Sequence, residues 1–184
     1  MAERIGADLR ALRKARDITL VELSAAVGRS VGWLSQVERG LAEPSVRDLG
    51  LLARHLGVSV SLFFRSASKR PEEQGVVLRS EDRIPIGSRA TGLMEELLSP
   101  SLGGAFEMIR STFAPHADSG GTRSARGRED GGVVISGRLL LTIDGVEFAL
   151  GPGDSFQFAG GDYAWRNDQD QPAVVHWIIA PPVY

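Results

Sequence analysis

The sequence predicts an α+β protein of two domains, a bundle of short helices in residues 1–64 followed by antiparallel β-structure in residues 76–184. Residues 18–40 have the spacing of two short helices packed across a tight turn, which is the helix-turn-helix pattern. Sixteen of the 22 glycines and eight of the nine prolines follow residue 64, where they separate short apolar runs as turns separate strands. Residues 65–75 are polar and aperiodic, which predicts a linker.

The helix-turn-helix pattern carries its own start and turn signals. Thr19 and Glu22 have capping-box spacing at the start of its first helix. Gly28 can make the turn, and Ser30 can cap the second helix. In proteins with this motif the second helix enters the major groove of DNA. The residues that would face DNA are Arg29, Ser30, Val31, Gly32, Trp33, Ser35, Gln36 and Arg39.

Three side chains of this region have specific expected roles. Gln36 can hydrogen-bond to a base edge, and Arg29 is a candidate for a phosphate contact. Phosphates repel an acidic group, so we expect Glu38 to brace Arg39 or local backbone amides instead of touching DNA.

Three further helices are expected around the motif, which gives five in the domain. Ile5, Leu9 and Leu12 recur at helical spacing in the first of them. Another restarts at Ser45, after Pro44. The last is a short helical turn that Ser59 would cap. Its expected core residues are Leu62, Phe63 and Phe64.

Apolar and polar residues alternate in the second half and predict its strands. The clearest are 106–113, 133–136, 139–143, 146–150, 155–158 and 173–179, and weaker candidates are 76–79 and 93–98. Asp144-Gly145 is a strong signal for a two-residue hairpin. The spacing of the strands favours an antiparallel barrel or a double-sheet jelly roll.

Two sets of motifs carry family resemblances. The run Leu-Ser-Gln-Val-Glu-Arg-Gly at 34–40, the Pro-Ser pair at 44–45 and Leu-Gly-Val-Ser at 56–59 make residues 5–64 similar to the N-terminal DNA-binding domain of Xre/Cro-type regulators. That resemblance implies a five-helix bundle like that of lambda repressor.

The second set lies in the β-rich half. Gly-Arg-Leu-Leu-Leu-Thr-Ile-Asp-Gly at 137–145, Gly-Pro-Gly-Asp at 151–154 and Tyr163-x-x-x-Asn167 are similar to motifs of a cupin barrel. Together the two halves resemble regulators that join an Xre-type helix-turn-helix to a cupin sensor, including repressors of polyamine and amino-acid catabolism. The resemblance implies a ligand-responsive repressor.

Cupins that bind a metal place two histidines and a glutamate on one strand and a third histidine on a later one. In this sequence Thr-Arg-Ser-Ala-Arg at 122–126 stands at the first histidine places, Asp130 at the glutamate place and Tyr163 at the late histidine place. We therefore expect no metal, no other cofactor and no enzyme activity. The residues from which a remnant site could be built are His116, His176 and Glu129 or Asp130.

Without a metal, the cupin would bind its ligand through hydrogen bonds, charge and aromatic contacts. The residues expected to line such a pocket are Arg110, Arg123, Arg126, Asp130, Gln157, Tyr163, Trp165 and His176. Each of them could equally fill core or form a surface ion pair. The arginines indicate a carboxylate or phosphate ligand, whereas the acidic pair at 129–130 and the family resemblance indicate an amine.

We therefore expect a homodimeric regulator that binds pseudo-palindromic operator DNA through residues 1–64 and a small-molecule effector through a cupin at 76–184. Residues 1–64 hold nine Lys/Arg against seven Asp/Glu, so the DNA prediction rests on the motif and not on charge. No run approaches the roughly 18–20 apolar residues of a membrane span, and we expect a cytoplasmic protein without a membrane partner.

Two other functions stay open. One is a metal-dependent cupin enzyme that carries a helix-turn-helix, which elemental analysis of the purified protein would reveal. The other is a ligand-independent DNA-binding protein whose barrel serves only assembly, and a ligand-induced rise in melting temperature would exclude it.

Overall fold

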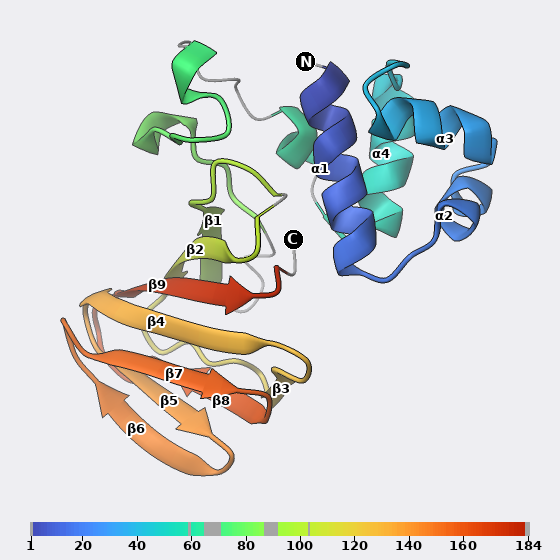
Figure 1. Ribbon diagram of the computed structural model, residues 1–184. Helices are drawn as coiled ribbons and strands as arrows, with labels where there is room; N and C mark the ends of the chain where they lie inside the picture. The colour runs from blue at the N-terminus through green and yellow to red at the C-terminus, as the bar shows by residue number, and fades with distance from the viewer. Residues whose placement is uncertain (1, 59, 65–70, 87–91, 103, 183–184) are drawn as a thin grey trace. The chain divides into compact units, whose positions relative to one another are not determined.

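The chain divides into two units in a computed structural model (Figure 1). One unit is made mainly of residues up to 84, and the other mainly of residues 85–98 and 106–181. The structure describes residues 2–58, 60–64, 71–86, 92–102 and 104–182. None of the helices in these ranges is long and apolar enough to cross a membrane.

The described residues of the first unit form four α-helices, α1 (Ala2–Ala15), α2 (Leu20–Ala26), α3 (Val31–Glu38) and α4 (Val46–His55). The prediction of a fifth helix of this type is wrong, because Val60–Phe64 form a 3-10 helix, η1. So short a segment cannot offset the cost of nucleating an α-helix, and 3-10 geometry is common in such pieces. Leu62 and Phe63 are buried as expected. Ser59 and the Phe64 side chain lie outside the described part of the chain.

Local sequence signals set the starts of α2 and α3. Thr19 Oγ1 accepts a hydrogen bond from the Glu22 N–H at 3.1 Å, and the Glu22 carboxylate accepts one from the Thr19 N–H at 2.7 Å. Ser30 Oγ accepts a hydrogen bond from the Trp33 N–H at 3.1 Å. The predicted capping box and the predicted Ser30 cap are therefore confirmed.

Helices α1 and α3 approach closely because Gly6 has no side chain. A Cβ atom at Gly6 would lie 2.2 Å from the carbonyl oxygen of Val37. Leu9 and Leu12 of α1 and Leu34 of α3 are fully buried. Burial of each such side chain contributes about 1.5–3 kcal/mol, and this core fixes the orientation of α3.

Two short 3-10 helices follow, η2 (Pro71–Glu73) and η3 (Ser80–Asp82). Of the predicted linker at 65–75, residues 65–70 lie outside the described part. The strand predicted at 76–79 is wrong. The first two backbone N–H groups of that segment donate to the carbonyl oxygen of the last η2 residue, at 3.0 and 2.9 Å, and so close a turn.

The second unit consists of two antiparallel sheets. One has the strand order β1-β2-β9-β4-β7 and the other the order β3-β8-β5-β6. The strands are β1 (Leu93–Leu97), β2 (Glu107–Phe113), β3 (Arg123–Ser124), β4 (Glu129–Ser136), β5 (Leu139–Ile143), β6 (Val146–Leu150), β7 (Ser155–Ala159), β8 (Asp162–Arg166) and β9 (Ala173–Ala180).

Most predicted strands are confirmed, but β3 and β8 were missed and β4 begins four residues before its predicted start. Strand β3 has only two residues, too few to show a period. Gly131 and Gly132 gave β4 the appearance of a turn, since glycine is depleted in strands. Pairing with β9 on one side and β7 on the other holds them in the sheet.

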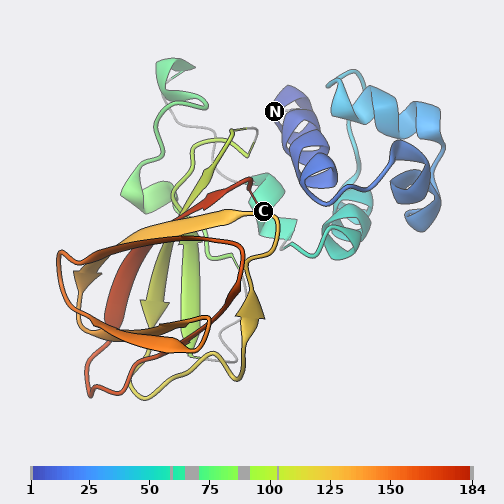
Figure 2. The same ribbon diagram turned by 60° about the horizontal axis from the view of Figure 1, so that its bottom comes forward.

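The two sheets lie face to face (Figure 2). Aromatic side chains from the two sheets meet between them. Phe113 of β2 meets Trp165 of β8 with ring centroids 4.7 Å apart, and Trp177 of β9 meets Tyr163 of β8 at 5.8 Å. No ladder joins the sheets among the described strands, so the prediction of a closed barrel is wrong and the double-sheet alternative holds. Strand β6 lies at the edge of its sheet, and its Phe148 is 45% exposed.

The predicted hairpin at Asp144-Gly145 is confirmed between β5 and β6. Both residues have positive φ, 47° and 81°, as a tight turn matched to the strand twist requires. Asp144 Oδ1 also accepts a hydrogen bond from the Asp162 N–H at 2.9 Å, which ties the hairpin to β8.

Candidate functional site

Helix α3 turns one face into the core and the other to solvent. Leu34, Val37 and Glu38 are buried, whereas Val31 and Gln36 are exposed. The other predicted DNA contacts that are exposed are Arg29, Ser30, Gly32 and Arg39, and Trp33 and Ser35 are half-buried. The eight residues predicted from the motif therefore lie on or beside an accessible surface of a helix whose opposite face is fixed.

Arg29 is engaged by the protein itself. Its Nε and Nη2 donate to the Asp48 carboxylate at 3.0 and 2.8 Å, and its Cζ lies 5.2 Å from the Trp33 ring centroid. Asp48 is buried and belongs to the capping box that starts α4, where Ser45 Oγ donates to it at 2.6 Å. Arg29 thus joins the turn before α3 to α4, and only its remaining N–H groups could reach a phosphate.

Glu38 does not pair with Arg39, which corrects the expectation from sequence. Its two carboxylate oxygens accept hydrogen bonds from Arg13 Nε and Nη2, at 2.6 and 2.9 Å. Arg13 also donates to the Ile18 carbonyl oxygen at 2.9 Å. This buried, bidentate pair fixes the end of α3 to α1, a long-range contact that local spacing could not reveal.

Asp48→Asn is expected to lower the free energy of unfolding by about 1–2 kcal/mol at pH 7, because charged hydrogen bonds are lost. The Ser45 hydroxyl and then Arg29 lower the pKa of Asp48 in the folded protein. Its stabilisation is therefore present above the unfolded pKa of about 4 and is lost as the pH falls through the folded value. Thermal unfolding from pH 7 to pH 3 should show the difference between wild type and variant shrink. Exposed Glu43→Gln is the control, and a constant difference would contradict this account.

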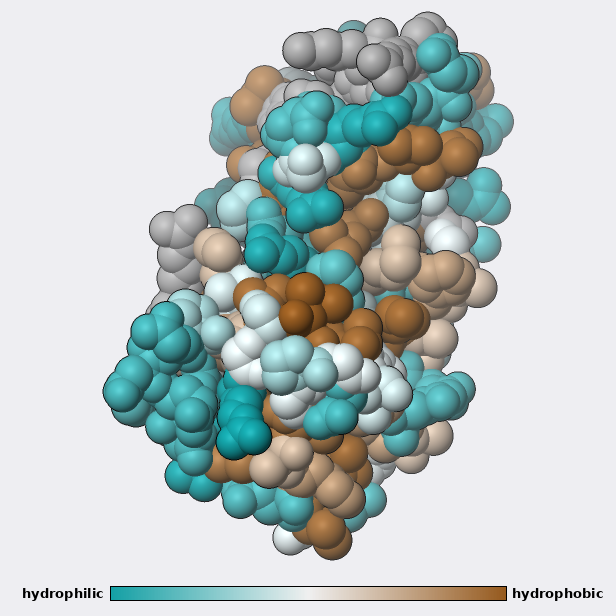
Figure 3. Space-filling view, turned by 90° about the vertical axis from the view of Figure 1, so that its left-hand side faces the viewer, coloured by the Kyte–Doolittle hydropathy of each residue, from teal (hydrophilic) through white to brown (hydrophobic). Residues whose placement is uncertain are grey.

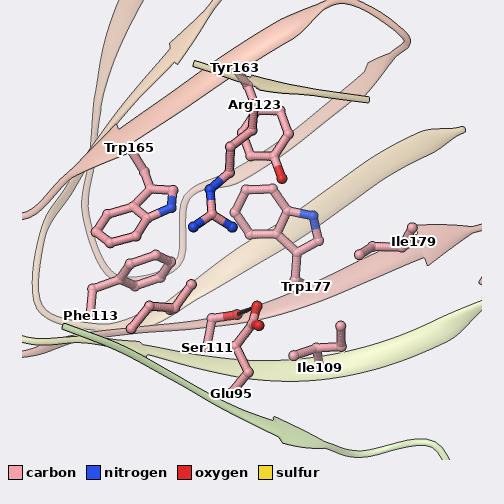
Figure 4. A pocket seen from close by; sticks show the side chains of 10 residues that line it. Glu95, Ile109, Ser111, Phe113, Arg123, Tyr163, Trp165, Trp177 and Ile179 are labelled. Atoms are coloured by element: carbon pink, nitrogen blue, oxygen red, sulfur yellow. Dashed lines mark hydrogen bonds between the residues drawn. The ribbon is translucent and has the colours of Figure 1, made fainter. Parts of the chain in front are cut away.

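A pocket opens between the two sheets of the second unit (Figure 4). It is lined by Leu93, Glu95, Ile109, Ser111, Phe113, Arg123, Tyr163, Trp165, Trp177 and Ile179. Three of the residues predicted for the ligand pocket are in this set, namely Arg123, Tyr163 and Trp165. The pocket combines aromatic walls with one basic and one acidic side chain.

Five of the predicted pocket residues lie elsewhere. Arg110 and His176 are opposite each other in the β2–β9 register and face away from the pocket, because their neighbours Ile109, Ser111 and Trp177 face inward. Arg110 donates to Glu96 at 2.9 Å. Of the other three, Arg126 is exposed and Asp130 is fully buried. The side-chain amide of Gln157 donates a hydrogen bond to Glu129.

Asp130 is fully buried on the inner face of its sheet, opposite Ile179, where it forms a polar cluster with Arg128. The Arg128 Nη2 donates to Asp130 Oδ2 at 3.1 Å and to the Tyr163 hydroxyl at 3.2 Å. Burial raises the pKa of Asp130 despite the opposing effect of Arg128, and burial likewise raises the pKa of Tyr163. The cluster holds the Tyr163 ring in place against the pocket.

Sequence reasoning missed Glu95, Ser111 and Trp177. On β1, Leu93, Glu95 and Leu97 face inward, which places an acidic side chain at a position that a strand with one buried face normally fills with an apolar residue. The alternation of Leu93, Glu95 and Leu97 was a signal available in the sequence. Glu96 places a glutamate on the other face of the strand as well, so the sequence did not show which face is buried.

The histidines and the aspartate from which a remnant metal site could be built do not come together around one point. Asp130 is committed to Arg128, His116 Nε2 lies 2.8 Å from an Asp170 carboxylate oxygen, and His176 lies on the outer face of its sheet. No group of three or more His, Cys, Asp or Glu side chains that could hold a metal occurs among the described residues. The remnant site considered from sequence is not assembled within them.

Comparisons with known proteins agree with both halves. Residues 4–63 match the helix-turn-helix domain family, and residues 109–179 match the cupin domain family. The chain is 27% identical over 156 residues to the HTH-type transcriptional regulator PuuR of Escherichia coli (strain K12), covering 85% of this chain and 83% of PuuR. Hydroxypropylphosphonic acid epoxidase from S. wedmorenis shares the fold alone, with a TM-score of 0.51 and 13% identity over 96% of this chain and 97% of the epoxidase.

One relative aligns with nearly the whole chain. The HTH-type transcriptional regulator SutR of Escherichia coli (strain K12) is 30% identical over 189 residues, covering 99% of this chain and 97% of SutR. The alignment therefore includes both the α3 surface and the strands around the pocket. The chain belongs to the family of HTH-type transcriptional regulators, with a cupin domain after its helix-turn-helix domain.

Proposed function

We propose that this protein is a ligand-responsive repressor in which α3 reads an operator in the DNA major groove and the cupin binds a small polar effector. The observation that carries the proposal is the exposed face of α3, held at its two ends by the Arg13–Glu38 and Arg29–Asp48 ion pairs. A recognition helix must be fixed in this way, because base reading depends on its orientation.

Gln36 is the proposed base-reading residue. Its amide is exposed on α3 and can form two hydrogen bonds with the edge of adenine in the major groove. One turn earlier, a Cβ atom at Gly32 would meet no atom of the protein within 4 Å. The packing of the protein itself therefore does not require a glycine at this position. Because Gly32 has no side chain, the α3 backbone can approach DNA closely there.

A homodimer is proposed on the geometry of DNA reading. Two recognition helices related by a two-fold axis would read half-sites roughly 34–36 Å apart. The outer face of the five-stranded sheet offers a surface for assembly, since an apolar groove there includes Phe106, 50% exposed, and Ile178, 45% exposed. The space-filling view shows apolar patches among polar ones on the face it presents (Figure 3).

The enzyme alternative has less support. The epoxidase shares only the fold, and the residues at the metal positions are unsuited to bind iron or its neighbours. We therefore propose a regulator without enzyme activity. It would act in the cytoplasm, where its operator is accessible. The ligand tests below distinguish this regulator from a protein whose cupin domain serves assembly alone.

Gln36→Ala is expected to reduce the discrimination between operator and random DNA by about 1–3 kcal/mol, because a bidentate base contact is lost. The operator would be obtained by selecting bound sequences from a random DNA library with the wild-type protein. Gel-shift titrations on operator and random DNA then give both affinities. Gln171→Ala, at an exposed glutamine of the cupin, is the matched control.

Unchanged discrimination in the Gln36 variant would remove this residue from base reading. A wild-type protein that enriches no sequence from the library would contradict the proposed function itself.

A further inference from the structure

The first turn of α3 carries an aromatic side chain that is held at the edge of the DNA-facing surface. Trp33 is half-buried, and the guanidinium of Arg29 lies over its ring, with Cζ 5.2 Å from the ring centroid. We propose that Trp33 reads the 5-methyl group of a thymine in each operator half-site, and that Arg29 is the positioning residue for its ring. This inference rests on the proposed DNA-binding function and names a base feature that the operator must contain.

The geometry of α3 places Trp33 beside the proposed base-reading residue. Residues three and four positions apart are neighbours on a helix surface, so Trp33 lies between exposed Gln36 and buried Val37. Long side chains in a helix point back toward its N-terminus, which directs the indole toward the turn where Arg29 meets it. The N-terminal residues of a recognition helix are the ones that contact base edges. Trp33 therefore lies at the end of α3 that comes closest to the bases.

Arg29 is itself held by α4, so the Trp33 ring rests on a fixed group. The Arg29 Nε and Nη2 donate to the Asp48 carboxylate at 3.0 and 2.8 Å, and Asp48 is buried in the capping box that starts α4. Such a bidentate contact sets the orientation of a guanidinium as well as its position. A ring that already lies against an ordered guanidinium loses less conformational entropy when it binds DNA than a freely rotating side chain does.

The chemistry of an indole selects the thymine methyl group among the features of the major groove. An indole offers apolar carbon and a single N–H donor, and most of its accessible surface is therefore apolar. The base edges present hydrogen-bond donors and acceptors, and thymine alone adds an apolar group, its 5-methyl. Gly32 precedes Trp33 on the chain and has no side chain to hold the two surfaces apart, since even a Cβ atom there would project into open space. A thymine below the first turn of α3 fits this surface.

The test uses the full chain and the operator that the wild-type protein selects from a random DNA library. Each thymine of one half-site is replaced in turn by uracil, which keeps the pairing with adenine but lacks the 5-methyl group. Gel-shift titrations should show a loss of affinity of about 3- to 5-fold at one position, the effect of removing one buried methyl group. Uracil at the equivalent position of both half-sites should square this factor.

Protein variants then assign the methyl contact to a side chain through the ratio of thymine to uracil affinity at the sensitive position. Trp33→Ala should bring this ratio to about 1, whereas Trp33→Phe, which keeps an aromatic ring, should retain part of the wild-type ratio. Arg29→Gln removes the group that holds the ring and should lower the ratio to below about 2-fold. The matched control is Val31→Ala, at an exposed apolar residue of the same turn, and it should keep the full wild-type ratio.

A selected operator at which no uracil substitution lowers the affinity would overturn the thymine assignment. So would a ratio that persists in Trp33→Ala or that disappears in Val31→Ala. A wild-type ratio in Arg29→Gln would overturn the positioning role of Arg29. These outcomes refute the inference alone, because each requires a protein that selects an operator, whereas a wild-type protein that enriches no sequence from the library refutes the proposed function.

Discussion

Replacing Gly6 with alanine is expected to lower the free energy of unfolding of the helical unit by about 1–3 kcal/mol. The new Cβ would lie 2.2 Å from the Val37 carbonyl oxygen, a backbone atom that moves only if α1 and α3 separate. Separation would loosen the Arg13–Glu38 pair at the same interface and reorient the DNA-reading face. We therefore expect weaker operator binding as well as lower stability.

The matched control is Gly50→Ala in the middle of α4. A Cβ atom at Gly50 would meet nothing within 4 Å, so this variant should gain about 0.5–1 kcal/mol from the better helix propensity of alanine. Hydrogen exchange of the α1, α3 and α4 amides measures both variants in the unit concerned. Equal changes in the two variants would show that the α1–α3 contact does not depend on Gly6.

Signals that act over a few residues were predictable from the sequence. The Thr19–Glu22 capping box, the Ser30 cap and the Asp144-Gly145 hairpin each involve groups no more than three residues apart. The role of Gly6 was not predictable, because it depends on Val37, which only the folded bundle brings close. The same reason explains why we expected Glu38 to brace Arg39 or local backbone amides, whereas it pairs with Arg13.

The sequence predicted only part of the pocket. The reason is that the sequences of its strands do not show which face of each strand is buried. Residues 107–113 have apolar side chains at both parities, so the sequence could not decide between Arg110 and Ser111 as the inward residue. A shift of one residue reverses every side chain in a strand. Arg123 and Tyr163 were found through the family positions that they occupy, and Glu95, outside those motifs, was not.

Effector binding is expected to change operator affinity by roughly 5- to 150-fold, the usual range for coupling between two sites. We expect the affinity to fall, because a ligand held between the sheets would favour an arrangement of the dimer in which the two recognition helices no longer match the half-site spacing. Tyr163→Phe removes the hydroxyl that Arg128 holds, and Trp165→Ala removes a pocket wall. Both should blunt the response and leave ligand-free operator binding nearly intact.

The coupling must also be reciprocal, since operator and effector act on one equilibrium. Operator DNA should therefore weaken binding of the effector by the same factor by which the effector weakens binding of the operator. Glu96→Gln, on the outer face of the sheet, should show the full wild-type response in both directions.

The most direct test of this account is a fluorescence-anisotropy titration of labelled operator with the full chain. It is carried out with and without a saturating concentration of the compound that most raises the melting temperature in a screen of amines, amino acids and small organic acids. The account predicts a dissociation constant that rises roughly 5- to 150-fold with that compound present. A compound that binds the protein yet leaves the dissociation constant unchanged would contradict the account and make the cupin an assembly module.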